Sequence, residues 1–382
     1  MIKSKAVELK VLGEEKPDLK MAANPFIPQN LVGRQAELHQ ICQILATDGD
    51  LMLAGVPGSG RRSLLRYAAK VVGSRIVEID CLRATDNHRF LQLLAENILA
   101  AFRAPAEQAL IEQWSVGQLL TLHRDPDGQA RLTWSVSRDD WLIFQALLTL
   151  PQVMAELLDC RVVLVFQNFP HIRSWDRSEK WQTYLRDEIQ HQSRVSYALI
   201  ATVAERWVQH TNMQVVFLGP LKNEDLYPWI TQTLAAAELE FEPQHALPLF
   251  LKYVQGHMGD AIALARRIWL DRQATLVEPT EPVQSHQVHQ SALFLVEDLS
   301  FTFESLILLL PPSQVRVLES LALDPTTSPH SREYIQKHQL SRGGGLQGAL
   351  ASLEQKGLVY GSEYGYRIAL PLLGFWLKHW LA

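Results

Sequence analysis

A glycine-rich loop directly after a short apolar strand is the feature that most constrains this fold. The loop, residues 55–63, reads Gly-Val-Pro-Gly-Ser-Gly-Arg-Arg-Ser and follows four apolar residues. Gly55 and Gly60 complete the pattern G-x-x-x-x-G of phosphate-binding loops, with Gly58 between them. Glycines let backbone N–H groups approach a phosphate, and the helix expected over 62–72 adds the positive end of its dipole. The pattern therefore predicts an α/β domain with a phosphate cradle.

The two residues after this loop depart from the usual chemistry. A lysine that reaches the outer phosphates and a hydroxyl that ligates Mg²⁺ are expected there, but the chain has Arg61 and Arg62. Arg61 still supplies positive charge, although as a planar fork rather than a compact ammonium. Arg62 cannot ligate a cation. The nearest hydroxyl residue, Ser63, comes one position after the expected one, which turns its side chain by about 100° around the helix. The sequence thus predicts the loss of the first protein ligand to magnesium.

A second predicted strand also lacks the residues that metal binding and hydrolysis need. In the strand predicted over 161–166, all residues after the first are apolar, and Gln167 and Asn168 follow it. An enzyme that hydrolyses ATP needs two carboxylates at these positions. Amides form hydrogen bonds but neither neutralise a divalent ion nor act as a base. The acids nearest in sequence, Asp159 and Asp176, lie at unsuitable positions. We expect no catalytic residues, no metal site and no ATP hydrolysis.

Two interpretations of the altered loop stay open at this point. In the first, the loop binds ATP or ADP without magnesium. Its binding residues would be Gly55, Gly58, Gly60, Arg61, Arg62, Ser63, Gln167 and Asn168. In the second, the loop is a relic held by packing and salt bridges, and no nucleotide binds.

Composition narrows the class of protein. The chain has 382 residues, 47% of them hydrophobic and 20% charged, and a net charge of −5. Nucleic-acid binding would therefore need a local basic patch. Cys42, Cys81 and Cys160 are widely spaced, which indicates reduced core residues in a cytoplasmic protein. Residues 1–21 lack the apolar stretch of a secretory signal, and no apolar run approaches the length of a membrane span.

The order of elements predicts several domains. Strands alternate with helices up to residue 218, which predicts a parallel sheet covered by helices on both faces, a three-layer α/β/α core. Residues 114–141 interrupt this order as a hairpin or an inserted loop. After residue 218 the pattern is helical only, and a Pro-, Gln- and His-rich stretch resembles a linker. The expected divisions are a tail over 1–23, the core over 24–220, a helical unit over 221–275, a linker over 276–298 and a C-terminal domain over 299–382.

The C-terminal domain has the pattern of a winged helix. Helices are expected over 313–322, 331–338 and 344–356, and short strands over 357–360 and 364–368 precede a terminal helix. That order of three helices and a two-stranded wing is typical of winged helix-turn-helix domains.

The charges of this domain leave its partner open. Residues 311–382 contain seven Lys and Arg against five Asp and Glu, a mild basic excess. Duplex DNA would be contacted by Arg342, Gln347 and Lys356, around the expected recognition helix. The alternative is a winged helix that contacts protein or inhibits its own chain. His257, His286 and His289 have no spacing typical of metal ligands and are interpreted as structural or solvated.

The motifs together resemble the archaeal-type ATPases, AAA+/STAND relatives of the origin-recognition proteins. The resemblance covers about residues 24–382. It rests on Asn-Pro-Phe at 24–26, Val-Gly-Arg at 32–34, the glycine loop, Gly-His-Met-Gly at 256–259 and the winged helix. Two positions depart from the family: the strand after residue 195 ends in Thr202-Val203 instead of Gly-Ser, and Met258 replaces a proline.

The resemblance implies a nucleotide-switched protein with a three-layer core, a helical lid and a winged helix. By position, Gly55, Gly60 and Arg61 would face phosphate, while Gln167 and Asn168 would occupy the metal and base positions. Arg186 matches an arginine that in the family lies near the nucleotide or a subunit boundary. The alternative is that Arg186 forms an ordinary surface salt bridge.

The function expected from this resemblance is that of a non-hydrolysing adaptor or regulatory subunit. It would serve a DNA-associated assembly, such as a mobile-element or defence system, with a protein partner, duplex DNA and a homo-oligomer as the expected contacts. One alternative is an active ATPase in which an acid elsewhere binds the metal. The other is a transcription regulator whose core merely orients the winged helix.

Overall fold

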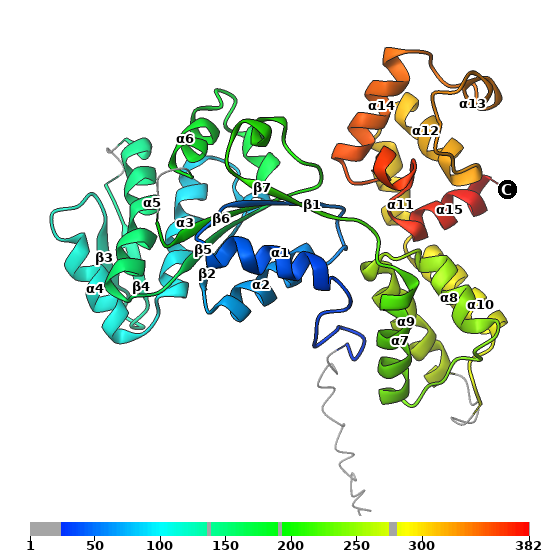
Figure 1. The fold of residues 1–382 in the computed structure, drawn as a ribbon, viewed down its shortest axis with the longest axis horizontal. Coiled ribbons are helices and arrows are strands. Elements are labelled where there is room, and N and C mark those ends of the chain that lie inside the picture. The colour runs from blue at the N-terminus through cyan, green and yellow to red at the C-terminus, as the bar shows by residue number, and fades with distance from the viewer. Residues whose placement is uncertain (1–23, 136–138, 190–192, 275–280, 382) are drawn as a thin grey trace, which may run out of the picture.

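The protein folds into a core beside a column of two helical domains (Figure 1). This computed structural model describes residues 24–135, 139–189, 193–274 and 281–381. The core lies at the left of Figure 1, and the two C-terminal units stack at its right. Among the described residues, no helix is long and apolar enough to cross a membrane.

A five-stranded parallel sheet forms the centre of the core. The strand order is β2-β5-β6-β1-β7, and every pairing is parallel, as predicted. Every residue of β1 and of β6 is buried, which explains why both are almost entirely apolar, with Ser196 as the exception in β6. The strands are β1 (Leu51–Gly55), β2 (Arg75–Asp80), β5 (Val162–Gln167), β6 (Val195–Ala201) and β7 (Gln214–Leu218).

Helices cover both faces of this sheet, which confirms the three-layer architecture. On one face, α1 (Gln35–Ala46) and α2 (Arg61–Val72) pack through Ile41, Leu64 and Leu65 against the sheet. On the other face, α3 (Asn87–Ala101) and α5 (Asp140–Leu157) bury a larger cluster around Phe90 and Phe144. The core is completed by α6 (Lys180–Glu188) and three short 3₁₀ turns, η1 (Cys81–Arg83), η2 (Phe169–Ser174) and η3 (Arg206–His210).

The interruption between α3 and α5 is a hairpin with its own helix. Strands β3 (Thr121–Arg124) and β4 (Ala130–Thr133) pair antiparallel across the Asp-Pro-Asp-Gly turn. Helix α4 (Pro105–Ser115) precedes them and contacts β3, while β4 contacts α3. Of the two expectations for this stretch, the hairpin is the one realised.

Four helices follow the core and form the lid. They are α7 (Asn223–Ala236), α8 (Ala246–Val254), α9 (Met258–Ala274) and α10 (Ser285–Asp298). Helix α10 lies inside the stretch 276–298 that we expected to be a linker. It packs on α8 and α9 and buries Val288, Ser291 and Ala292, because its apolar residues recur at helical spacing despite the polar composition.

A winged helix ends the chain, as predicted. Helix α11 (Ser300–Leu308) precedes the three helices of the motif, α12 (Pro312–Leu323), α13 (Arg332–Lys337) and α14 (Gly344–Gln355). Strands β8 (Val359–Tyr360) and β9 (Arg367–Ile368) pair antiparallel around the turn η4 (Ser362–Tyr364). The last helix, α15 (Pro371–Leu381), packs on α12 and on the lid helix α8.

Candidate nucleotide-binding site

The glycine loop has the backbone geometry of a phosphate cradle. It connects the end of β1 to α2, whose N-cap is Gly60. Gly58 and Gly60 have φ angles of 82° and 88°, in the left-handed region that favours glycine. No atom lies within 4 Å of the position that a Cβ would take at Gly60. The space beside the helix N-terminus is therefore open to an anion.

A cavity of about 510 Å³ adjoins this loop. The glycine loop and the end of β5 contribute polar residues and glycines to its lining: Gly58, Gly60, Arg61, Arg62, Ser63, Gln167 and Asn168. Apolar residues of the N-terminal segment and the lid also line it: Ile27, Leu31, Val32, Leu221, Met258 and Ile262. A lining of both kinds suits a ligand with phosphates and an aromatic base, and the volume is typical of a small-molecule site.

Arg61 is a half-buried cation without a carboxylate partner in the described part of the chain. Its Nη1 donates to the carbonyl oxygen of Ala201 at 2.9 Å, and among the described residues it forms no ion pair. Burial lowers the pKa of Arg61 to about 10, so the guanidinium stays charged at neutral pH. A desolvated cation beside an open cradle favours an anionic ligand.

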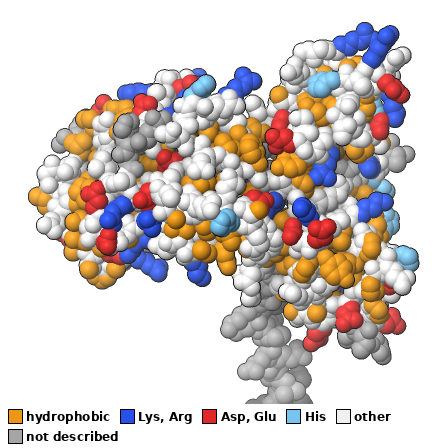
Figure 2. All heavy atoms as spheres, in the orientation of Figure 1, with side chains coloured by type: hydrophobic (Ala, Val, Ile, Leu, Met, Phe, Trp, Pro, Cys, Tyr) orange, Lys and Arg blue, Asp and Glu red, His pale blue; other side chains and the backbone are white. Residues whose placement is uncertain are grey.

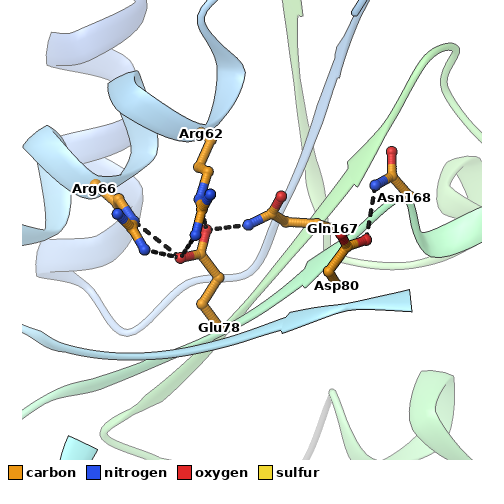
Figure 3. A network of polar contacts seen from close by, with 6 residues as sticks. All are labelled: Arg62, Arg66, Glu78, Asp80, Gln167 and Asn168. Atoms are coloured by element: carbon orange, nitrogen blue, oxygen red, sulfur yellow. Dashed lines mark hydrogen bonds and ion pairs between the residues drawn. The ribbon is translucent and has the colours of Figure 1, made fainter. Parts of the chain in front are cut away.

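Arg62 is instead paired within the protein. Its Nε and Nη2 donate to the two oxygens of Glu78 at 2.8 and 2.9 Å, a bidentate ion pair. Arg66, one turn further along α2, donates to the same carboxylate, as Figure 3 shows. These contacts join α2 to β2 and hold the guanidinium of Arg62 on Glu78. The hydrogen bond to Glu78 raises the pKa of Arg62.

The amides at the end of β5 are engaged with carboxylates from the neighbouring strand. Gln167 donates through Nε2 to Glu78, and Asn168 donates through Nδ2 to Asp80 at 2.9 Å (Figure 3). Asp80 also accepts the backbone N–H of Leu82 at 3.1 Å. Neither acid was expected at the site from the sequence, although β2 pairs with β5 and places Asp80 directly opposite Gln167. The alternating pattern Glu-Ile-Asp at the end of β2 was the signal.

This arrangement does not fit a magnesium ion. Glu78 is surrounded by two guanidinium groups and an amide, all donors. Glu78 and Asp80 do not line the cavity beside the loop but an adjacent cleft of about 410 Å³, which shares Arg62 and Gln167 with that cavity. Among the described residues, no group of three or more His, Cys, Asp or Glu side chains is arranged to hold a metal. The carboxylates of Glu78 and Asp80, the ligand type that magnesium prefers, therefore do not line the cavity beside the loop, although the serines Ser59 and Ser63 do.

His257 also contacts the loop, a role that the sequence did not reveal. Its Nε2 donates to the carbonyl oxygen of Pro57 at 2.7 Å, and its Nδ1 lies 2.9 Å from Oδ1 of Asp260. Burial of the ring opposes its charged form, but Asp260 and the Pro57 carbonyl outweigh burial and raise the pKa of His257. The backbone N–H of Gly259 donates to the carbonyl oxygen of Gly58 at 3.1 Å. The lid thus holds the loop through side chain and backbone.

The winged helix closes over the same loop. A Cβ at Gly357, after α14, would lie 2.5 Å from Cδ of Pro57. Asp260 accepts the backbone N–H of Leu372 through Oδ2 at 2.9 Å, so the lid residue that pairs with His257 also contacts the winged helix. Core, lid and winged helix therefore meet at the glycine loop.

The remaining predicted residues lie elsewhere. Arg342 and Gln347 are exposed near the start of α14, while the ammonium of Lys356 donates to Gln314 at 2.9 Å and to Ser352 at 2.8 Å. The guanidinium of Arg186 stacks over Trp207 at 4.5 Å from the ring centre and does not line the cavity. Of the alternatives for Arg186, the surface salt bridge is not formed among the described residues, where the guanidinium makes this stacking contact instead.

Comparison with known proteins agrees with this architecture. A family model described as a probable winged helix domain matches residues 301–379. The solved structure of the Walker-type ATPase PABY2304 of Pyrococcus abyssi has a TM-score of 0.64 and 13% identity, covering 91% of this chain and 96% of that one. The chain has the fold of this Walker-type ATPase and ends in a winged helix domain.

Other solved structures are more distant. The Orc1 protein of Aeropyrum pernix in complex with DNA has a TM-score of 0.49 and 16% identity, covering 93% of this chain and 95% of that one. The RuvB branch migration motor of Thermotoga maritima has a TM-score of 0.45 and 14% identity, covering 90% and 95%. No curated protein matches this chain.

Proposed function

We propose that this AAA+-fold protein is a non-hydrolysing adaptor or regulatory subunit of a DNA-associated assembly, with ATP or ADP bound as a structural ligand without magnesium. The observation that carries the proposal is the pairing of Arg62 with Glu78 beside the amides Gln167 and Asn168. Hydrolysis of ATP needs a metal on the outer phosphates and an acid near the attacking water. Here the positions that would supply the metal ligands and the acid are occupied by Arg62, Gln167 and Asn168, whose side chains donate hydrogen bonds.

Retained nucleotide binding is supported by different residues. The cradle at Gly58 and Gly60 keeps its backbone conformation, and Arg61 is a charged group without an internal carboxylate. The hydroxyl of Ser59, a residue that is 6% exposed, has no hydrogen-bond partner among the described residues and lies in the loop itself. Buried polar groups normally have partners, which favours a polar ligand at this position.

The decisive experiment measures nucleotide binding and phosphate release on the full chain. We expect ATP and ADP to bind with affinities that change by less than about threefold when Mg²⁺ is replaced by EDTA. Phosphate release should not exceed that of Gly60→Asp, which places a carboxylate in the cradle. Arg61→Gln should weaken nucleotide binding at least about tenfold, because it removes a desolvated cation.

Two results would contradict the proposal. Magnesium-dependent ATP binding with turnover above the Gly60→Asp variant would show an active enzyme. No detectable binding of either nucleotide would leave the loop as a relic held by packing. Arg124→Gln, which removes an exposed arginine from the distant hairpin, is the matched control for the loss of one positive charge.

An active ATPase is a second candidate because Asp80 lies beside Asn168. In that case Asp80 would carry the metal that Gln167 cannot hold. Asp80→Asn would then abolish turnover, whereas under our proposal it leaves nucleotide binding without magnesium unchanged.

A DNA-binding regulator is a third candidate because the start of α14 is exposed. Arg342 and Gln347 are accessible there, in contrast to the end of α14, which faces the core. Salt-dependent binding of duplex DNA that is lost on Arg342→Glu, but retained on Arg103→Glu in the core, would support it.

A further inference from the structure

A second large cleft separates the core from the winged helix. Its volume is about 750 Å³, and it shares no lining residue with the nucleotide cavity. One wall consists of the ends of β1 and β7, together with residues 202–207 after β6. The other wall consists of the last turns of α14 and the wing, residues 359–364. Figure 2 shows acidic side chains where the winged helix faces the core across this junction.

The wall formed by the winged helix is acidic and aromatic. Glu354 and Glu363 both line the cleft, and among the described residues neither carboxylate has a hydrogen-bond or ion-pair partner. Burial and the charge of Glu363 raise the pKa of Glu354, which is the response of a carboxylate that has no cation beside it. The rings of Tyr360 and Tyr364 lie beside these acids, with centroids 5.4 Å apart.

Unsatisfied polar groups line the same cleft. Tyr360 is 6% exposed, and its hydroxyl has no hydrogen-bond partner in the described part of the chain. On the opposite wall, the indole N–H of Trp207 is also buried and unpartnered within the described ranges. Such groups are uncommon in a folded protein unless a ligand or ordered water completes them.

The core wall adds an exposed aromatic ring and little net charge. Phe217 is 47% exposed. Arg173 and Glu205 pair with each other, which leaves Arg206 as an exposed cation on this side. The two walls therefore differ: the unpaired acids lie on the winged helix, and among the described residues that line the cleft the core contributes one unpaired arginine, Arg206.

We propose that this cleft binds a basic segment of a partner polypeptide, with an arginine side chain seated against Glu354, Glu363 and the ring of Tyr364. The guanidinium of Arg367 already lies 5.4 Å from the centre of the Tyr360 ring. A guanidinium combines the three properties that this wall selects: it is cationic, it donates to carboxylates in a fork, and it stacks on aromatic faces. The indole N–H of Trp207 is suited to a backbone carbonyl of the same segment. Duplex DNA is disfavoured here, because phosphates would meet unpaired carboxylates.

This inference rests on the adaptor role proposed above and gives it a partner chemistry. Peptide binding and nucleotide binding take place in different cavities and are measured with different probes. A protein that binds ATP but no basic peptide would remain a nucleotide-binding scaffold and would overturn only the inference. A protein that binds the peptide but no nucleotide would overturn only the nucleotide part of the proposed function.

The test is fluorescence anisotropy with the full chain and a labelled hexapeptide, Gly-Ala-Arg-Ala-Arg-Gly. We expect saturable binding that weakens at least about tenfold when both arginines are replaced by neutral citrulline, which keeps the shape but not the charge. The double variant Glu354→Gln and Glu363→Gln should show the same loss. Arg206→Gln should leave the affinity unchanged or increase it.

The control removes two acids from distant exposed positions, Glu112→Gln and Glu297→Gln. If this variant loses as much affinity as the Glu354/Glu363 variant, the binding reflects net charge alone and the inference is wrong. It is also overturned if the wild-type chain does not bind the peptide, or if the citrulline peptide binds equally well. Thermal unfolding of each variant verifies that it is folded, and Tyr364→Leu, which removes a ring without changing charge, provides an independent test of the aromatic contribution.

Discussion

At the scale of single residues, Asp50 is a half-buried carboxylate whose charge opposes folding. It precedes β1, and its Oδ1 accepts the backbone N–H of Tyr197 at 2.7 Å. Burial raises the pKa of Asp50 to about 7, and the hydrogen bond only partly opposes this shift. The pKa of Asp50 in the folded protein thus lies above the ordinary value of 3.8. The contribution of Asp50 to stability is therefore complete below about pH 4, where the carboxyl is protonated, and it is lost as the pH rises to about 7.

Asp50→Asn should therefore stabilise the protein at high pH. The amide keeps an acceptor for Tyr197 and removes the half-buried charge, so the free energy of unfolding at pH 8 should rise by about 1–3 kcal/mol. At pH 5 the difference should be much smaller. Urea unfolding at both pH values measures this. The control is Asp48→Asn, which breaks an exposed ion pair with Arg161 and should slightly lower the free energy of unfolding at both pH values. A stability gain at pH 8 no greater than that of Asp48→Asn would contradict the prediction.

Two glycines of the loop have similar dihedral angles but different surroundings. A Cβ at Gly58 would lie 2.4 Å from Nε2 of His257, whereas a Cβ at Gly60 would meet no atom within 4 Å. Both substitutions to alanine cost about 1 kcal/mol of backbone strain. Gly58→Ala should cost at least about 2 kcal/mol more, because it displaces a buried imidazole and its two hydrogen bonds. Equal losses of unfolding free energy in the two variants, measured by urea unfolding, would show that His257 does not hold the loop.

At the scale of secondary-structure elements, much of the fold follows from the sequence. The apolar runs before the glycine loop and over 161–166 predicted β1 and β5, and the loop predicted where β1 becomes α2. The stretch over α10 was misjudged because its histidines and glutamines hide a helical pattern that is buried only in the presence of α8 and α9. The acids Glu78 and Asp80 were missed for a related reason: their proximity to Gln167 follows from strand order, which a sequence does not state.

The contact between α2 and β2 determines the charge of the candidate site. Glu78 neutralises Arg62 and Arg66, whose side chains are 56% and 54% exposed. Glu78→Gln should free these cations and strengthen ATP binding without magnesium by about threefold to tenfold, while costing about 1 kcal/mol of stability. Titration calorimetry in EDTA measures the affinity. Glu107→Gln breaks the ion pair with Arg75 at the other end of β2 and should leave the affinity unchanged. Weaker ATP binding by Glu78→Gln would instead assign the carboxylate a direct role in the site.

At the scale of the whole molecule, one side chain joins three domains. Asp260 in α9 pairs with His257, which holds the glycine loop, and accepts an N–H from the first turn of α15. Arg34 donates to the carbonyl oxygen of Gly219, against which the ring of Tyr364 packs. The winged helix therefore meets the core around the loop through these contacts and through a small apolar cluster of Val56, Tyr360 and Ala369. We expect small changes at the loop to alter the orientation of the winged helix.

Asp260→Ala should release the winged helix without unfolding any domain. The variant loses the partner of His257 and the acceptor for Leu372, while each domain keeps its own apolar core. We expect a larger radius of gyration in small-angle X-ray scattering and faster proteolysis of the segments between domains, with little change in helix content by circular dichroism. Glu333→Ala, which removes an acid from the first turn of α13, is the matched control for the loss of a helix-terminal charge. An unchanged radius of gyration for Asp260→Ala would show that packing alone, through Gly357 and Tyr364, is enough to keep the domains together.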